Sequence, residues 1–462
     1  MPIEIRNPAA PDQIVATYDE TPDNALDEVV ARARAAQLKW AALPQPERGV
    51  MVTNFVNALE TRSEEIAKSI TKEMGKPLAE ARGEAMKALG EARASVARAN
   101  APIGEVFGSQ MPGTVSYSTR RPRGVILGIN PWNFPFSTPM RKAIPALVYG
   151  NAIILKPASL TPGAVALMAE VAASTLPENL VQAVIGRGAL GQALAEHRGI
   201  DAVSFTGSVE VGKRVATAAA GHLAEVSLEL GGKNPAILND ASDLEKVLDQ
   251  ILLAAFAVCG QRCTAVSRVI VHRDIEEAVV SGLAARAAAM EPMDGMIEGA
   301  KIGPLASAQQ LEDVAGFVSR AVSDGAVIAA GGHRLESPGG GYFYAPTILR
   351  GVTRDMEIAR QEVFGPVLSL IAYDTVDEAL SIANDTAFGL SSCLYSERTD
   401  LVERFVAESE SGMLHVNAGS FPENHLPFVG IKDSSMGVGG SNGPSTIQFY
   451  TTEHAVYRRA CV

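Results

Sequence analysis

The chain has 462 residues, of which 47% are hydrophobic and 20% charged, and its formal net charge is −12. This length exceeds what one simple core needs and is typical of two or three domains. Nucleic-acid-binding proteins normally carry a basic face, so the acidic balance excludes that class and no nucleic-acid partner is expected.

Nothing in the sequence indicates a membrane or secreted protein. It has no uninterrupted apolar run of the roughly 18 residues that span a bilayer, and residues 1–7 lack the basic and apolar regions of a signal peptide. The four cysteines, at positions 259, 263, 393 and 461, are too few for a disulfide scaffold, and no ligand spacing indicates a metal. We expect a cytoplasmic protein without metal or membrane contact.

The first hundred residues are predicted to be helical. Apolar residues recur at helical spacing over 51–59, and Pro46 suits the first turn of that helix. From residue 123, short apolar runs closed by turns alternate with helical stretches, which predicts a parallel α/β sheet. The predicted strands are 125–127, 153–155, 181–185 and 202–205, and the helices between them include 163–174 and 209–220.

The same alternation restarts after residue 231. The predicted strands are 236–238, 269–271, 327–328 and 367–371, with helices at 243–258 and 275–290. We therefore expect a second α/β unit from about 231 to 438. The tail from Gln448 to Tyr457 alternates like an edge strand.

Cys263 is the candidate nucleophile, in a turn between a predicted helix and a predicted strand. A thiol there can be partly exposed, and Arg262 or the helix end could favour its thiolate form. Taken alone, a small buried thiol is the commoner fate of a cysteine. If the helix continues, Cys259 lies one turn before Cys263, and an oxidant could join the two as a reversible off-switch.

Two further side chains are candidates for a role in catalysis. Glu229 ends an apolar alternation directly before two glycines, which suits a general base, although a carboxylate that only caps the turn is the alternative. Asn133 stands between two prolines, and its amide could stabilise an oxyanion or simply complete a turn.

Three segments could bind a nucleotide. Lys156 follows the strand 153–155, where ligands of open α/β sheets bind, although a solvated lysine is the alternative. The glycines of Gly186–Gly191 match G-x-G-x-x-G, which alone is weak evidence. Gly207 and Ser208 precede the helix 209–220, whose N-terminus is an equally good phosphate site.

Together these segments resemble the aldehyde dehydrogenase superfamily over nearly the full chain. Their order and the 34 residues between Glu229 and Cys263 agree with that family, and their joint occurrence is far more specific than any one motif. The matching segments are 131–135, 156–157, 205–208, 229–233, 260–263 and 362–366.

The resemblance implies an α/β fold with two doubly wound α/β domains and a small β oligomerisation extension. The cofactor-binding domain would comprise 1–103 and 123–230, and the catalytic domain 231–438. The strands 104–122 and 439–462 would join subunits, so homodimers or homotetramers are expected.

The resemblance also implies chemical roles. Cys263 would attack the aldehyde, Asn133 would hold the oxyanion, and Glu229 would activate the water that hydrolyses the thioester. Lys156 and Glu362 would hold ribose hydroxyls of a nicotinamide cofactor. The residues implied at that cofactor are Ile129, Pro131, Trp132, Lys156, Ser159, Gly207, Ser208, Leu230, Glu362 and Phe364. Family members do not use the Gly186–Gly191 fingerprint in its usual way.

Cofactor and substrate are predicted more narrowly from single positions. NAD-preferring relatives often carry glutamate where Ser159 stands, so NADP is favoured, with NAD as the alternative. The succinate-semialdehyde dehydrogenase branch is most similar, and there Arg141 would hold a distal carboxylate unless it pairs with a neighbour. Phe421 and His425 would line the aldehyde pocket or fill their own loop.

The chain also departs from that branch. Ala257 replaces a second substrate arginine, and Val429, Ser435 and Val438 interrupt the C-terminal motif. Hence 2-oxoglutarate semialdehyde, a sulfonated aldehyde and an aromatic aldehyde remain alternatives. CoA-acylating relatives generally lack the base, so Glu229 argues against them, and the complete catalytic set argues against a non-enzymatic binding protein.

Overall fold

A β-hairpin precedes the helices at the N-terminus. In the computed structural model, which describes residues 2–459, β1 (Ile3–Asn7) and β2 (Ala10–Tyr18) pair antiparallel. The two isoleucines of β1 are buried and its charged residues exposed. The Tyr342 N–H donates to the Pro8 carbonyl (2.9 Å), which ties the hairpin to the second α/β unit. The all-helical prediction is therefore wrong for these residues.

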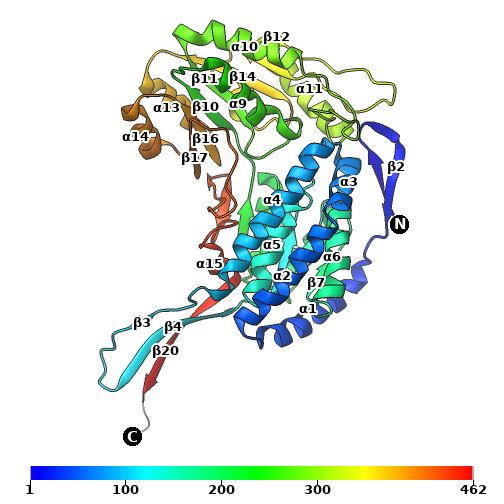
Figure 1. The fold of residues 1–462 in the computed structure, drawn as a ribbon, viewed down its shortest axis with the longest axis vertical. Coiled ribbons are helices and arrows are strands. Elements are labelled where there is room, and N and C mark those ends of the chain that lie inside the picture. The colour runs from blue at the N-terminus through cyan, green and yellow to red at the C-terminus, as the bar shows by residue number, and fades with distance from the viewer. Residues whose placement is uncertain (1, 460–462) are drawn as a thin grey trace.

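The first α/β unit, in the lower half of Figure 1, has a six-stranded sheet in the order β19-β9-β8-β5-β6-β7. Its strands are β5 (Val125–Ile129), β6 (Ala152–Lys156), β7 (Val181–Ala183), β8 (Ala202–Thr206), β9 (Glu225–Glu229) and β19 (Ser435–Gly437). Its helices are α1 (Leu26–Ala41), α2 (Gln45–Thr61), α3 (Ser63–Met74), α4 (Leu78–Val96), α5 (Ser137–Val148), α6 (Gly163–Thr175), α7 (Gly188–Glu196) and α8 (Val209–Ala220), with short 3-10 turns at Asp23–Ala25 and Ala97–Asn100. Strands β5 to β9 are parallel, and every residue of β6 is buried, as a sheet covered on both faces requires.

The strand order places a topological switch point between β5 and β8. The chain runs outward from β5 to β6 and β7, then returns to the other side of β5 as β8. Ligands of open parallel sheets bind beyond the carboxyl ends of the strands at such a point. Here those ends are Ile129 and Thr206.

The second α/β unit has a seven-stranded sheet in the order β12-β13-β14-β11-β10-β16-β17. Its strands are β10 (Asn234–Leu238), β11 (Val266–His272), β12 (Val327–Ala330), β13 (Thr347–Arg350), β14 (Val367–Tyr373), β16 (Ser391–Tyr395) and β17 (Met413–Val416). Its helices are α9 (Leu244–Phe256), α10 (Glu276–Ala288), α11 (Ala308–Ser323), α12 (Glu357–Arg360), α13 (Val376–Asn384) and α14 (Thr399–Glu408), with 3-10 turns at Ala257–Gly260 and Arg273–Ile275. All pairs are parallel except β12 with β13.

The chain then returns to the first unit. A small pair, β15 (Phe388–Gly389) with β18 (Ile431–Lys432), precedes β19, which pairs antiparallel with β9. The predicted extent of the second unit, 231–438, therefore includes a strand that belongs to the first sheet.

A β-arm projects from the lower left of Figure 1. Strand β4 (Thr114–Pro122) pairs with β20 (Thr451–Arg459) along its whole length and with the short β3 (Val106–Phe107). The predicted edge strand from Gln448 begins instead at Thr451, because residues 446–450 form the helix α15 (Thr446–Tyr450).

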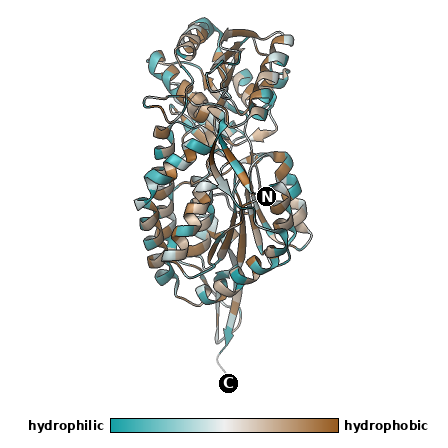
Figure 2. Cartoon of the chain, turned by 90° about the vertical axis from the view of Figure 1, so that its right-hand side faces the viewer, coloured by the Kyte–Doolittle hydropathy of each residue, from teal (hydrophilic) through white to brown (hydrophobic). Residues whose placement is uncertain are grey.

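Each large sheet has its own hydrophobic core. In Figure 2 the strands inside the lower unit are mostly brown, whereas outward helix surfaces carry teal. Phe55 and Trp40 of the first core are at most 1% exposed, and the Trp40 indole N–H donates to the Leu147 carbonyl (2.8 Å). Burying each such side chain contributes roughly 1.5–3 kcal/mol. Within residues 2–459, no helix is both long and apolar enough to cross a bilayer.

Candidate active site

A cleft of about 1140 Å³ extends from the carboxyl ends of β5, β6 and β8 to the loop that carries Cys263. Every site residue predicted from the sequence lines this cleft, with the exception of His425. Segments far apart in the chain thus converge at the switch point of the first sheet, where a ligand is expected to bind.

The Cys263 loop is fixed by close backbone packing. Helix α9 ends at Phe256, and Val258 and Cys259 adopt left-handed conformations with φ of 57° and 55°. A Cβ on Gly260, whose φ is 68°, would lie 2.1 Å from the Gly365 carbonyl oxygen. Only glycine fits at this position. The close packing therefore fixes the loop three residues before Cys263.

This geometry removes the basis for an oxidative link to Cys259. The predicted helix does not continue, so the one-turn spacing between the two thiols does not exist. Cys259 is buried in the core of the second unit, whereas Cys263 packs against a separate cluster that includes Phe428. Both thiols are free.

The surroundings of Cys263 favour the neutral thiol. Burial first, and then the charges of Glu362 and Glu229, raise the pKa of the Cys263 thiol to about 12 against a smaller opposing effect of Arg141 and Arg262. The thiol is therefore protonated at neutral pH, and a base has to take its proton before the sulfur attacks.

Asn133 is held near Cys263 by a buried ion pair. Its amide donates to the Gln261 carbonyl (2.9 Å), two residues before Cys263. Lys76 Nζ donates to the Asn133 carbonyl (2.9 Å) and pairs with Glu84 (2.5 Å), and both charged side chains are at most 1% exposed. Glu84 also accepts the two N–H groups that open α5 (3.0 Å each). This pair was not predicted, because Lys76 and Glu84 match no motif.

Replacing Lys76 by methionine should destabilise the protein by roughly 3–5 kcal/mol, because Glu84 would remain buried without its partner. The free energy of unfolding in guanidinium chloride measures the loss. The double variant Lys76→Met, Glu84→Gln should recover part of it, since neither charge remains. A single-variant loss below about 1 kcal/mol would show that the pair behaves like an exposed one.

Glu229 lies at the end of β9 and is held through both carboxylate oxygens. The Thr206 hydroxyl donates to one oxygen (3.2 Å), and the Ser441 N–H donates to the other (3.1 Å). Lys142 Nζ donates to the same hydroxyl (2.7 Å), and burial lowers the pKa of Lys142 to about 7. A buried amine thus connects to Glu229 through one hydroxyl. Thr206 could have been found from its place at a strand end, before Gly207.

Glu362 lies against the glycines that follow Glu229. Its carboxylate accepts the Gly232 N–H (3.0 Å), and a Cβ on Gly231 would lie 2.1 Å from its second oxygen. Burial raises the pKa of Glu362 to about 7. The two glycines therefore let a carboxylate from the second unit reach the wall of the cleft.

Trp132 and Phe364 connect the two units across the cleft. Their rings meet edge to face, with centroids 5.4 Å apart. Phe364 has a φ of 55°, and the Gln310 amide holds its carbonyl (3.0 Å). Such backbone strain in a cleft wall persists only where the surrounding contacts fix it.

Lys156 ends β6 at the opposite end of the cleft, near Ser159. It is 6% exposed, and burial lowers the pKa of Lys156 to about 8 while the charge of Glu20 partly opposes that shift. Gly207 and Ser208 lie beside it in the cleft wall; a Cβ on Gly207 would come within 2.6 Å of the Phe205 ring.

The G-x-G-x-x-G segment does not show the steric demands of a dinucleotide fingerprint. A Cβ on Gly188 would meet nothing within 4 Å, and one on Gly191 would make ordinary contact with Lys156 at 3.6 Å. Only a Cβ on Gly186 would clash, with Leu190 at 2.3 Å. These glycines line or adjoin the cleft without being required for a close approach.

The predicted substrate residues occupy different surroundings. Arg141 lines the cleft, but its guanidinium makes a two-pronged contact with the buried Glu91 (2.7 and 2.8 Å). Phe421 lines the cleft and is 43% exposed. His425 lies outside the cleft, in a separate small hollow, and its nearest charged partner is Glu423 (3.6 Å).

Two cationic side chains that were not predicted as substrate ligands lie at the same end of the cleft as Phe421. Arg262 donates to the Ser420 carbonyl (2.9 Å) and stacks on Phe421 (4.2 Å), while its buried Nη1 has no hydrogen-bond partner within residues 2–459. No carboxylate of the described chain forms an ion pair with it. Lys87 donates to the Pro422 carbonyl (2.9 Å), and burial lowers the pKa of Lys87 to about 8.

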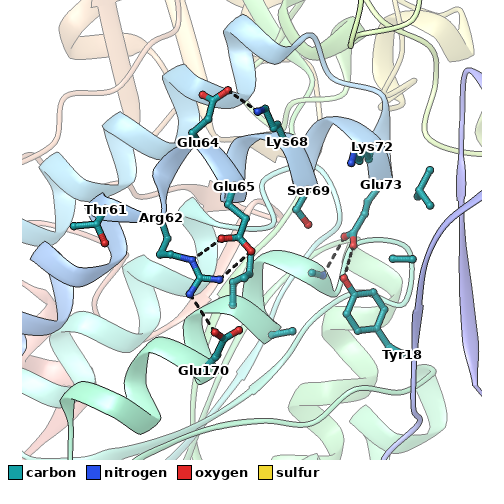
Figure 3. A pocket seen from close by; sticks show the side chains of 15 residues that line it. Tyr18, Thr61, Arg62, Glu64, Glu65, Lys68, Ser69, Lys72, Glu73 and Glu170 are labelled. Carbon is teal, nitrogen blue, oxygen red and sulfur yellow. Dashed lines mark hydrogen bonds and ion pairs between the residues drawn. The ribbon is translucent and has the colours of Figure 1, made fainter.

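A second hollow of about 740 Å³ lies between β2, α3 and α6, outside the cleft (Figure 3). Several of its charged side chains pair with one another: Arg62 with Glu65 and Glu170, and Lys68 with Glu64. At one end Glu73 accepts the Tyr18 hydroxyl (2.9 Å) and the Gly163 N–H (3.1 Å). These groups satisfy each other and hold the N-terminal hairpin against α3 and α6.

Comparison with known proteins agrees with this geometry. Residues 1–456 match the model of the aldehyde dehydrogenase family. The chain is 37% identical over 460 residues to the alpha-ketoglutaric semialdehyde dehydrogenase of Bacillus subtilis (strain 168), covering 98% of this chain and 94% of that protein. Lactaldehyde dehydrogenase from Escherichia coli superposes with a TM-score of 0.96 at 33% identity, covering 100% and 96% of the two chains.

A second similar structure is the betaine aldehyde dehydrogenase from Staphylococcus aureus in complex with NAD+ (TM-score 0.94, 28% identity, covering 99% and 91%). The chain belongs to the aldehyde dehydrogenase family. It is accordingly an NAD(P)-dependent aldehyde dehydrogenase with that family's fold.

Proposed function

We propose that the enzyme oxidises an aldehyde that carries a distal carboxylate, such as 2-oxoglutarate semialdehyde or succinate semialdehyde. The observation that carries this proposal is the guanidinium of Arg262, which is buried beside Cys263 with one nitrogen unpartnered and no carboxylate paired to it. Glu80 acts on this cation only through its charge, without an ion pair, so a substrate carboxylate that paired with the buried guanidinium would stabilise it. Arg141, the residue first predicted for this task, is already neutralised by Glu91.

The relative from Bacillus subtilis supports this choice, because its name specifies a semialdehyde with a carboxylate at its far end. Lys87 adds a second positive charge at the same end of the cleft, next to Phe421 and Pro422. We assign Phe421 to the wall that encloses the substrate chain and give His425 no contact with the substrate.

Cys263 supplies the nucleophile in the first step. Glu229 takes the thiol proton, the sulfur bonds to the aldehyde carbon, and the carbonyl oxygen becomes an oxyanion. One N–H of the Asn133 amide is used by Gln261, so its other N–H, with the Cys263 backbone N–H, stabilises that oxyanion. Loss of hydride from the carbon then leaves a thioester on Cys263.

Glu229 serves again in the second step. Having passed the thiol proton on to solvent, it takes a proton from water as the water oxygen attacks the thioester carbon. The carbon–sulfur bond then breaks, the acid is released, and the Cys263 sulfur regains a proton from Glu229. The Thr206 hydroxyl and the Ser441 N–H hold the carboxylate in position, and Lys142 offers a further proton-accepting site behind Thr206.

The cleft fits a nicotinamide dinucleotide. Such a cofactor, when bound, accepts the hydride. The glycines at 207 and 231 leave no room for side chains, and the buried Lys156 amine faces the cleft at the end opposite Cys263. We assign Lys156 to the hydroxyls of the adenosine ribose and Glu362 to those of the other ribose. Gly207 and Ser208 are assigned to the pyrophosphate, and Leu230 and Phe364 to the nicotinamide side. Ile129, Pro131 and Trp132 form the wall between them.

We propose that the enzyme accepts both NADP and NAD, and that the serine at position 159 favours NADP. A glutamate at that position would repel a 2′-phosphate, whereas the serine hydroxyl can hydrogen-bond it. A kcat/KM for NAD that exceeds that for NADP by about tenfold or more would contradict this preference.

Kinetics over a panel of aldehydes tests the substrate class. We expect kcat/KM to be highest for the two semialdehydes, with butanal, benzaldehyde and betaine aldehyde far lower. Arg262→Leu should lower kcat/KM for the semialdehydes by about 100-fold, the worth of a hydrogen-bonded charge, and change that for butanal little. Lys87→Met should act in the same direction, and Arg262→Lys should restore part of the loss.

A preference for betaine aldehyde, or an Arg262→Leu effect that is equal for anionic and neutral aldehydes, would contradict the proposed class. A thioester that passes to coenzyme A rather than water would indicate the acylating alternative, and no cofactor reduction over the whole panel would indicate a binding protein. Neither alternative uses Glu229 as a base, although the Thr206 hydroxyl and the Ser441 N–H hold its carboxylate in position.

We also propose that the β-arm joins two or four copies of the chain. It exposes large apolar side chains, including Val106 (81%) and Tyr457 (71%), on a sheet that packs against little else. The three cysteines in the described part of the chain are unpaired, which suits the reducing cytoplasm we propose as its location.

A further inference from the structure

The segment after the N-terminal hairpin is docked on the loop that leads into α7. The Thr21 N–H donates to the Ile185 carbonyl (2.8 Å), and the Thr21 hydroxyl accepts the Ile185 N–H (3.2 Å). Next to it, the Glu20 carboxylate accepts the N–H of Arg187 (3.2 Å), the residue that precedes α7. Glu20 therefore brings a negative charge to the N-terminus of a helix, where the helix dipole stabilises negative charge.

Lys156 lies against the first turn of the same helix. A Cβ on Gly191 would be 3.6 Å from both Cδ and Cε of Lys156. Gly188, Gly191, Lys156 and Ser159 all line the cleft. Glu20 is also the side chain whose charge counters the effect of burial on the pKa of Lys156. Glu20 and Lys156 are thus electrostatic neighbours at the end of the cleft assigned to the adenosine ribose.

We propose that Glu20 is a cofactor-specificity residue, whose carboxylate disfavours the 2′-phosphate of NADP and so keeps NAD competitive. The proposal rests on the placement of the adenosine ribose at Lys156. A 2′-phosphate carries close to two negative charges at neutral pH, whereas the 2′-hydroxyl of NAD carries none. Repulsion from Glu20 therefore weakens the binding of NADP and not that of NAD. It offsets part of the preference for NADP that Ser159 provides.

The test compares Glu20→Gln with the charge-retaining control Glu20→Asp, with both cofactors at pH 7, where Lys156 is mostly protonated. Glu20→Gln should raise the ratio of kcat/KM for NADP to that for NAD about tenfold, with the NAD value within about twofold of wild type. Glu20→Asp should keep the wild-type ratio. High salt should shrink the difference between the two variants, because it screens charge.

Two results overturn the proposal: a ratio in Glu20→Gln within about twofold of wild type, or an equal loss with both cofactors, which indicates a structural role only. Lys156→Met separates this failure from failure of the cofactor placement. If it raises KM for both cofactors while Glu20→Gln leaves the ratio unchanged, only the role of Glu20 is wrong. If it changes neither KM, the adenosine ribose does not lie at Lys156, and both proposals fall.

Discussion

Cys263→Ser is expected to lower kcat for aldehyde oxidation by at least about 10⁴-fold. The cleft already raises the pKa of the thiol to about 12, so the far less acidic serine hydroxyl cannot be ionised there by Glu229. The loss should appear in the first turnover as well as in the steady state, because no thioester forms. Stopped-flow measurement of cofactor reduction distinguishes the two phases.

Cys393→Ser is the matched control. Cys393 is also a free thiol whose pKa burial raises to about 12, but it is fully buried on β16, outside the cleft. It should retain kcat within about threefold of wild type. Residual activity above about 1% in Cys263→Ser, or an equal loss in Cys393→Ser, would contradict the assignment of the nucleophile.

Sequence periodicity predicted the strands and helices that form the two large sheets. The helix predicted at 209–220 coincides with α8, because apolar spacing and a following glycine define both its ends. The N-terminal hairpin was missed although Ile3 and Ile5 alternate with charged residues. A five-residue alternation is short, and the contacts that stabilise the hairpin come from residues such as Tyr342, far along the chain.

The proposed catalytic residues could be named from the sequence because their motifs are local and their order along the chain is distinctive. Partners across the fold could not be, since they depend on which strands become neighbours. Lys142 stands next to Arg141 in the sequence, yet it is Lys142 that reaches Thr206 and Arg141 that is taken by Glu91. Which of two adjacent cations faces a carboxylate is decided by helix rotation and packing, which a motif does not specify.

Arg262 was not predicted as a substrate residue for a related reason. In the sequence, a cation beside the nucleophile was interpreted as support for the thiolate. In the structure its effect on the thiol pKa is outweighed by burial and two carboxylates. The residue lines the cleft, and one of its guanidinium nitrogens is buried without a hydrogen-bond partner within residues 2–459. Burial without a partner is a three-dimensional property, so this residue became a substrate candidate only with the fold.

Glu229→Gln is expected to lower steady-state turnover by about 10³-fold while one equivalent of reduced cofactor per site still forms. The amide can keep the contacts with Thr206 and Ser441, so the fold and the oxyanion site should remain intact. With Glu229 replaced, water or the Lys142 amine behind Thr206 has to take the Cys263 proton, so this first turnover becomes slower but still occurs. Water then meets the thioester without a base, so the acyl-enzyme accumulates and limits the cycle.

Hydroxylamine provides the decisive measurement for this variant, because it attacks thioesters without needing a general base. Added to Glu229→Gln, it should restore turnover and yield the hydroxamate of the substrate acid, whereas it should not restore Cys263→Ser. Glu229→Asp, which keeps a carboxylate at a shorter reach, should lie between wild type and the glutamine variant. A steady-state rate of Glu229→Gln within about tenfold of wild type would mean that another group activates the water, and Lys142 behind Thr206 would then be the nearest candidate.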